Sequence, residues 1–103
     1  MESEGVSLER EQGISGFIVD GLQNKLIVEF YGDIYHCNPR HFRDPDEFCS
    51  WIGRTVTQQW ARDRKRLGVF YKLGYRVVIV WEADWKTHPE NEIRRVKNAL
   101  SED

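Results

Sequence analysis

Runs of apolar positions divide the chain into expected strands. Residues 16–21 and 25–33 are rich in β-branched and aromatic side chains, and residues 22–24 between them form a turn signal, so they predict an antiparallel hairpin. Residues 76–82 are apolar almost without interruption, which is typical of a strand whose two faces are both covered.

Helix starts are indicated where Ser, Thr or Asp stands three residues before Glu or Gln, with Pro close behind the cap as a further signal. This pattern predicts three helices: residues 44–53 (Asp44 with Glu47, and Pro45), 55–74 (Thr55 with Gln58, and Gly74 as the stop) and 87–100 (Thr87 with Glu90, and Pro89).

The expected order is strand, strand, helix, helix, strand, helix. The segment from Lys25 to Glu82 is long enough for a crossover that joins parallel strands, and the hairpin beside it makes the sheet mixed. We therefore expect an α/β fold with a mixed sheet flanked by helices, formed by a single domain over residues 13–103. Residues 1–12 are charged and are expected to be a flexible tail or the remnant of a linker.

Composition narrows the class of protein. With 40% hydrophobic and 13% aromatic residues among 103, the chain can build a core without disulfides. The net charge of −2 excludes a uniformly basic nucleic-acid binder, but the 15 Lys and Arg are clustered and predict a local basic face. No apolar run reaches the ~20 residues of a membrane span. Two cysteines outside any CxxC pair fit reduced thiols in a cytoplasm.

Glu29 breaks the pattern of its strand, because alternation places it on the same face as Ile27 and Tyr31. A buried carboxylate there would need a metal ion or a partner cation, whereas a solvent-facing position would need nothing. Asp33 and His36 follow at the end of this strand and could form one site with Glu29. The alternative is that Asp33 is an ordinary turn residue and His36 a hydrogen-bonded loop histidine.

Asp63 breaks the pattern of the long helix. It lies on the apolar stripe, three residues after Trp60 and four before Leu67, and therefore needs a polar partner. The expected partner is the imidazole of His36, and the alternative is a structural ion pair with an arginine. Glu82, at the end of the last expected strand, would lie near the end of the Glu29 strand.

Three segments together resemble a known family: residues 29–36, the WxxD of residues 60–63, and residues 73–82. They resemble the very-short-patch-repair (Vsr) endonucleases of the PD-(D/E)xK superfamily, and more closely the phage intron-encoded EDxHD homing endonucleases. The resemblance implies a nuclease core that hydrolyses DNA with Mg²⁺ or Mn²⁺ in a bacterial cytoplasm. It also implies four catalytic residues: Glu29 and Asp33 as metal ligands, His36 as general base or water-positioning group, and Asp63 as the residue that orients it.

The sequence departs from the repair enzymes in one respect. Their ligating aspartate corresponds to Gly16, while Asp20 lies nearby, so the resemblance favours a metal site built on Glu29. Cys37, His41 and Cys49 have irregular spacing and no convincing fourth partner, which disfavours a structural zinc site. A supporting shell around the catalytic groups is expected from four residues: Asp20, Tyr35, Asn38 and Glu82.

Double-stranded DNA is the expected partner, contacted by basic side chains near the proposed site: Arg40, Arg43, Arg62, Arg64, Lys65 and Arg66. A domain this small would need a second copy or a further DNA-binding domain to recognise a long target. Two alternatives fit the same residues: a mismatch-nicking repair endonuclease, and a DNA-binding module that has the fold without catalysis.

Overall fold

The structure is a computed structural model that describes residues 9–14 and 16–102. Within these residues, strands β1 (Glu9–Ile14), β2 (Phe17–Gln23), β3 (Leu26–Tyr31) and β6 (Arg76–Trp81) form one sheet in the order β1-β2-β3-β6. The pairs β1–β2 and β2–β3 are antiparallel, and β3–β6 is parallel. The expected mixed sheet, with its hairpin and its parallel crossover, is therefore confirmed.

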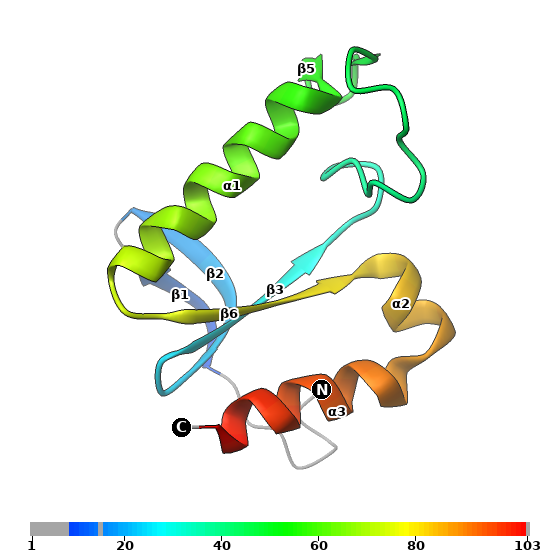
Figure 1. The fold of residues 1–103 in the computed structure, drawn as a ribbon. Coiled ribbons are helices and arrows are strands. Elements are labelled where there is room, and N and C mark those ends of the chain that lie inside the picture. Colours follow the sequence, from blue (N-terminus) through cyan, green and yellow to red (C-terminus); the bar gives the residue numbers. More distant parts are fainter. Residues whose placement is uncertain (1–8, 15, 103) are drawn as a thin grey trace.

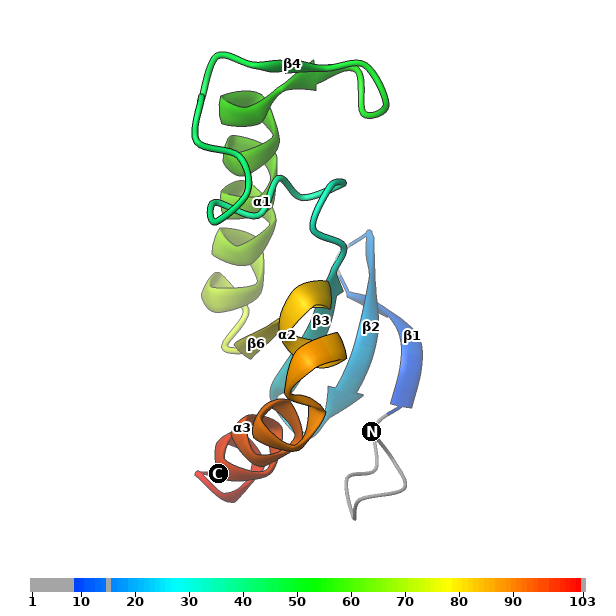
Figure 2. The same ribbon diagram turned by 90° about the vertical axis from the view of Figure 1, so that its right-hand side faces the viewer.

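Helices cover both faces of the sheet (Figure 1). Helix α1 (Val56–Lys72) is the crossover between β3 and β6 and lies on one face, whereas α3 (Pro89–Ser101) lies on the other. The short helix α2 (Glu82–Thr87) joins β6 to α3. A small hairpin of β4 (Phe48–Cys49) and β5 (Arg54–Thr55) stands at the N-terminal end of α1, away from the sheet (Figure 2).

Strand β3 owes its central place to its apolar side chains, which are buried on both faces. Leu26 and Val28 pack with Val80 and Val96 on the α3 side, whereas Ile27 packs with Phe70 on the α1 side. Each such side chain contributes roughly 1.5–3 kcal/mol when it is fully buried. Alternation therefore turns the odd-numbered residues of β3, including Glu29, toward α1.

The long helix begins and ends as its sequence predicts. Thr55 accepts a hydrogen bond from the Gln58 amide, and the Gln58 side chain accepts one from the Thr55 amide, which completes the expected capping box. The chain leaves the helix at Gly74, whose φ of +87° is readily adopted only by glycine.

The prediction of a helix over residues 44–53 is wrong, since this segment forms turns and the first part of the β4–β5 hairpin. Asp44 caps only a local turn, through a bond from the Asp46 amide to its side chain. The Pro45 carbonyl accepts from both the amide and the hydroxyl of Thr57 at the start of α1. These contacts dock the loop onto α1 and satisfy the backbone groups that a helix would otherwise use.

Two further boundaries differ from expectation. Glu82 does not end the last strand but begins α2, which the sequence pattern missed. The capping box expected at Thr87 is absent, because the Thr87 hydroxyl donates instead to the Ala83 carbonyl and His88 precedes α3. Pro89 does occupy the first turn of α3, as expected.

The N-terminal boundary also moves. Residues 9–12, expected in the tail, belong to β1, and residues 1–8 lie outside the described residues. Among the described helices, none has the length and apolar character that crossing a bilayer requires.

Candidate active site

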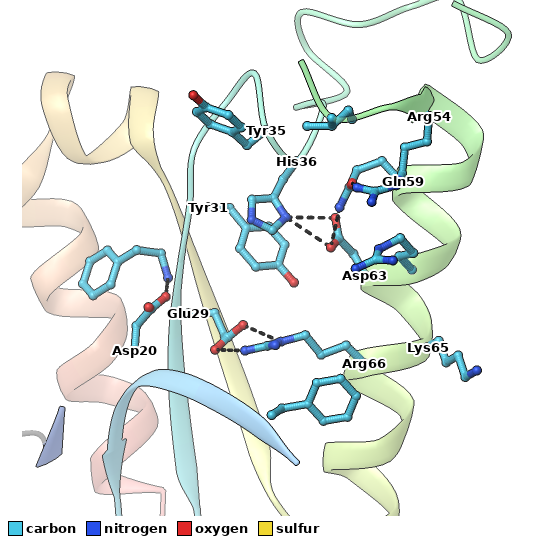
Figure 3. A pocket seen from close by; sticks show the side chains of 14 residues that line it. Asp20, Glu29, Tyr31, Tyr35, His36, Arg54, Gln59, Asp63, Lys65 and Arg66 are labelled. Atoms are coloured by element: carbon cyan, nitrogen blue, oxygen red, sulfur yellow. Dashed lines mark hydrogen bonds and ion pairs between the residues drawn. The ribbon is translucent and has the colours of Figure 1, made fainter. Parts of the chain in front are cut away.

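An open cleft of about 670 Å³ lies between α1 and the β2–β3 end of the sheet (Figure 3). It collects acidic, basic and aromatic side chains that are distant in the sequence, from both strands, from the loop after β3 and from α1. The polar residues that line it are Asp20, Glu29, Tyr31, Tyr35, His36, Arg54, Gln59, Arg62, Asp63, Lys65 and Arg66.

His36 and Asp63 form the pair that the sequence led us to expect. The Nδ1 atom of His36 lies 3.1 Å from both carboxylate oxygens of Asp63. Because an ionised carboxylate only accepts hydrogen bonds, Nδ1 carries the proton in neutral imidazole. The lone pair is then on Nε2, the ring atom that can accept a proton from a ligand.

Both partners of this pair are held in place by their surroundings. The His36 amide donates to the Gly32 carbonyl at 3.0 Å, which closes a turn directly after β3. On α1, Gln59 lies one turn before Asp63, and its side-chain amide donates a hydrogen bond to the Asp63 carboxylate at 3.0 Å. The side-chain oxygen of Gln59 in turn accepts a hydrogen bond from Arg54. Only 15% of the Asp63 side chain and 28% of the His36 side chain are exposed.

Tyr31 packs directly against the imidazole. Its ring is parallel to that of His36, with centroids 3.9 Å apart and an angle of 7° between the planes. Figure 3 shows the two rings overlapping, with the tyrosine hydroxyl pointing toward Asp63 and Arg66. The imidazole is therefore held at one edge by Asp63 and on one face by Tyr31.

Glu29 is buried, with 3% of the residue exposed, and it is paired with Arg66. Arg66 Nε lies 2.9 Å from one carboxylate oxygen, and Nη2 lies 3.0 Å from the other. Burial raises the pKa of Glu29 above its ordinary value of 4.5, while Arg66 opposes this rise and the neighbouring charge of Asp20 adds to it. Of the two ways foreseen to compensate a buried charge, a metal ion or a partner cation, the second is present.

Arg66, expected from the sequence to contact DNA, is therefore engaged within the protein instead. It turns inward, donates also to the Ile18 carbonyl, and lies over the rings of Phe17 and Phe70. The helical spacing accounts for this inward direction, because Arg66 lies three residues after Asp63 and is on the same face of α1.

Asp20 reaches the cleft from β2. Its carboxylate accepts a hydrogen bond from the Phe30 amide at 2.8 Å, just beyond the Gly21–Val28 pair where the ladder between β2 and β3 ends. Its negative charge adds to the rise in the pKa of Glu29. Asp20 and Glu29 both line the cleft.

Asp33 lies outside this group and does not line the cleft. Its carboxylate accepts from the buried Asn38 amide at 2.9 Å, and its own backbone amide donates to Glu82 at 3.2 Å. Glu82 also pairs with Lys86, which lowers its pKa, as does the bond from Asp33. Asp33, Asn38 and Glu82 thus fix the loop after β3 to the start of α2.

Besides Arg66, the five basic residues expected to contact DNA fall into two groups. Arg40 is occupied, since its guanidinium donates to both oxygens of Asp84 at 2.9 and 3.0 Å, and this contact lowers the pKa of Asp84. Four others are without a paired carboxylate among the described residues, Arg62 and Lys65 lining the cleft and Arg43 and Arg64 exposed elsewhere.

Cys37 and Cys49 are both fully buried and pack together beneath the loop, whereas His41 is exposed. Burial and the adjacent Cys49 raise the pKa of the Cys37 thiol to about 11, so it stays protonated at neutral pH. Over residues 9–14 and 16–102, no group of three or more His, Cys, Asp or Glu side chains is arranged to hold a metal ion.

Three residues that shape the cleft were not predicted from the sequence: Arg54, Gln59 and, as a partner of His36, Tyr31. Gln59 had a usable signal, because it stands four residues before Asp63 on the same helical face. The stacking of Tyr31 on His36 had none, since it depends on the turn that folds residue 36 back over residue 31.

Comparisons with known proteins add no family to this description. No protein-family model matches the chain, and no curated protein or solved structure is significantly similar to it.

Proposed function

We propose that this chain is the catalytic domain of a metal-dependent endonuclease that hydrolyses phosphodiester bonds of double-stranded DNA. The observation that carries the proposal is the gathering of His36, Asp63, Glu29 and Asp20 in one cleft whose rim is basic. These residues come from β2, β3, the following loop and α1. The side chains of His36, Asp63 and Glu29 lie on the α1 side of β3, whereas Asp20 lies against the Phe30 backbone amide (Figure 3).

The His36–Asp63 pair supplies the base. Asp63 keeps the proton on Nδ1 and so leaves Nε2 free to accept one from water, which converts the water into the nucleophile. The carboxylate also stabilises the imidazolium that results from this transfer. A general base of this kind typically contributes a factor of roughly 10²–10⁴ to the rate.

Two of the carboxylates that line the cleft offer oxygen donors of the kind that a hard divalent cation takes. Carboxylate oxygens are the ligands that Mg²⁺ prefers, and Glu29 and Asp20 would hold the ion. The ion would lower the pKa of bound water and offset the charge of the phosphate. Arg66 now neutralises Glu29, so it would have to leave that carboxylate, and its guanidinium would then be free to contact phosphate.

Arg62 and Lys65 provide the electrostatic attraction for the DNA backbone. Both are exposed at the cleft and have no carboxylate partner among the described residues, so neutralising phosphate would cost them no existing ion pair. The exposed side chains of Ile34, Tyr35 and Trp51 add apolar surface, and Tyr35 reaches the cleft itself.

The proposal is tested by cleavage of supercoiled plasmid DNA in the presence of Mg²⁺ or Mn²⁺. We expect His36→Ala to keep its circular dichroism spectrum and to cut at least about a hundredfold more slowly, because the base is lost. His41→Ala is the matched control, since His41 is an exposed histidine in the same loop and does not line the cleft. Cleavage by His36→Ala at the wild-type rate would contradict the assignment.

The products separate a double-strand endonuclease from a nicking repair enzyme. Linear plasmid as the first product indicates coordinated cutting of both strands, which requires two active sites and therefore two copies of the chain on the DNA. Accumulation of nicked circles indicates one cut per encounter, as the mismatch-nicking alternative requires.

A DNA-binding module without catalysis is the second candidate, favoured by the Glu29–Arg66 pair, which already compensates the buried carboxylate. Calorimetric titration with Mn²⁺ distinguishes the two. The nuclease proposal requires a saturable site that is weakened in Asp20→Asn, whereas the module requires none at millimolar metal. DNA binding with no metal site and no cleavage would favour the module.

A further inference from the structure

Tyr31 differs from the other aromatic residues near the cleft in being enclosed. Only 4% of the residue is exposed, and its ring lies face to face with His36 at 3.9 Å. Trp81, its register partner on β6, contacts the same ring edge-on, with centroids 5.2 Å apart and an angle of 83° between the planes. The tyrosine ring is thus enclosed between Trp81 of the sheet and His36 of the following loop.

The hydroxyl of Tyr31 is not what holds the residue in place. The oxygen is buried and has no hydrogen-bond partner among the described residues, although a buried hydroxyl normally finds one. Burial, with Asp63 and Glu29 nearby, raises its pKa, so the group stays neutral. The contacts that remain, and that define the position of the side chain, are those of its ring.

A single carboxylate cannot fix an imidazole by itself. The contact of Nδ1 with Asp63 holds one edge of the ring. It leaves the ring plane able to tilt about the axis from Nδ1 to the carboxylate, and this tilt would move Nε2 within the cleft. A flat surface 3.9 Å away, parallel to within 7°, removes that freedom. Catalysis by a general base depends on this angle as well as on distance.

We propose that Tyr31 is a positioning residue, whose ring serves as the wall that sets the plane of the His36 imidazole and so aims Nε2. The proposal rests on the nuclease function proposed above. It assigns the task to the aromatic face of Tyr31 and not to its hydroxyl, which makes the conservative variant Tyr31→Phe informative.

The experiment compares Tyr31→Phe, Tyr31→Leu and the wild type by two measurements. The first is the NMR chemical shift of the His36 ring protons, which the stacked aromatic ring moves upfield. The second is plasmid cleavage, with the rate at saturation separated from the affinity for DNA. Tyr75→Leu is the matched control, because it removes a half-buried tyrosine at the opposite end of β6, where Lys25 lies over its ring.

We expect Tyr31→Phe to keep the upfield shift and the cleavage rate, with an unchanged or higher melting temperature because no hydrogen bond is lost. Tyr31→Leu should lose the shift and cut about tenfold to a hundredfold more slowly at saturation, with unchanged affinity for DNA. Tyr75→Leu should lower the melting temperature without moving the His36 signals.

Three results would overturn the proposal: retention of the upfield shift in Tyr31→Leu, an unaltered rate in that variant, or equal damage in Tyr31→Phe. If the wild type cuts no DNA, the nuclease function fails, and the chemical shifts alone decide whether Tyr31 sets the plane of the ring.

Discussion

At the scale of single residues, every carboxylate in the cleft has a defined donor. Asp63 receives hydrogen bonds from His36 and Gln59, Glu29 from Arg66, and Asp20 from a backbone amide. Buried charge is tolerated in proteins only when it is compensated in this way. The cleft therefore supplies each of its acidic groups with a hydrogen-bond donor.

Asp63→Asn should change the tautomer of His36 without disturbing the fold. An amide can donate to Nδ1, which would place the ring proton on Nε2 and remove the lone pair that accepts a proton. We expect a normal fold and a fall in plasmid cleavage of roughly 10²–10⁴. Asp84→Asn, which removes the surface partner of Arg40, is the matched control and should cut at nearly the wild-type rate. Full activity of Asp63→Asn would show that the tautomer does not matter.

Glu29 predicts a pH dependence of stability with a definite sign. Its pKa is raised in the folded state, so above pH 4.5 the native protein binds more protons at this site than the unfolded chain does. Stability from this group is therefore greatest at low pH and falls as the pH rises through the folded-state pKa. Urea unfolding across a pH series should show this decline in the wild type and a weaker one in Glu29→Gln. An equal decline of unfolding free energy with pH in both proteins would contradict this role of Glu29.

At the scale of elements, α1 is both the crossover of the sheet and one wall of the cleft. Its start is fixed by the Thr55 capping box, directly before the turns that carry Gln59 and Asp63. Thr55→Ala should cost about 1 kcal/mol of the free energy of unfolding. Thr87→Ala, at a position with the same sequence pattern but no capping bond, should cost less than about 0.5 kcal/mol. Similar losses in the two variants, measured by chemical denaturation, would contradict this difference.

The elements that the sequence predicted correctly are those set by local periodicity and local caps. The β2–β3 hairpin, the parallel β6 and the 17-residue α1 follow from alternation, apolar runs and the Thr55–Gln58 pair. Residues 44–53 carry an equally good capping pattern, but a tertiary contact between Pro45 and Thr57 determines their conformation. Helix α2 is only 6 residues long and has no buried residue, so it leaves no apolar stripe to detect.

The candidate site was predictable to a similar extent. The His36–Asp63 contact could be foreseen because an acid on an apolar helical stripe demands a polar partner. The place of Asp33 could not, since it depends on how the loop after β3 meets α2 through Asn38 and Glu82. The inward direction of Arg66 had a signal in its helical spacing from Asp63, but its partners on the sheet depend on tertiary packing.

At the scale of the whole molecule, a net charge of −2 conceals an uneven distribution. Arg62→Ala at the cleft should weaken DNA binding and reduce by about one the slope of log affinity against log salt. Arg94→Ala, on the α3 side of the sheet, removes the same charge and should leave the slope unchanged. Fluorescence anisotropy with a labelled duplex over a range of salt concentrations measures both slopes. The same slope in Arg62→Ala and Arg94→Ala would show that the DNA does not contact the cleft at Arg62.

The position of Gln59, Asp63 and Arg66 along one stretch of α1 has a consequence for how the chain tolerates insertions and deletions. Adding one residue between them would rotate everything beyond it by about 100° and carry the later side chains away from their partners on β3 and its loop. The loop over residues 41–44, which precedes the contact of Pro45 with α1, has no helical register to preserve. Variation in length among homologous chains should therefore gather in that loop, while the spacing within α1 stays constant.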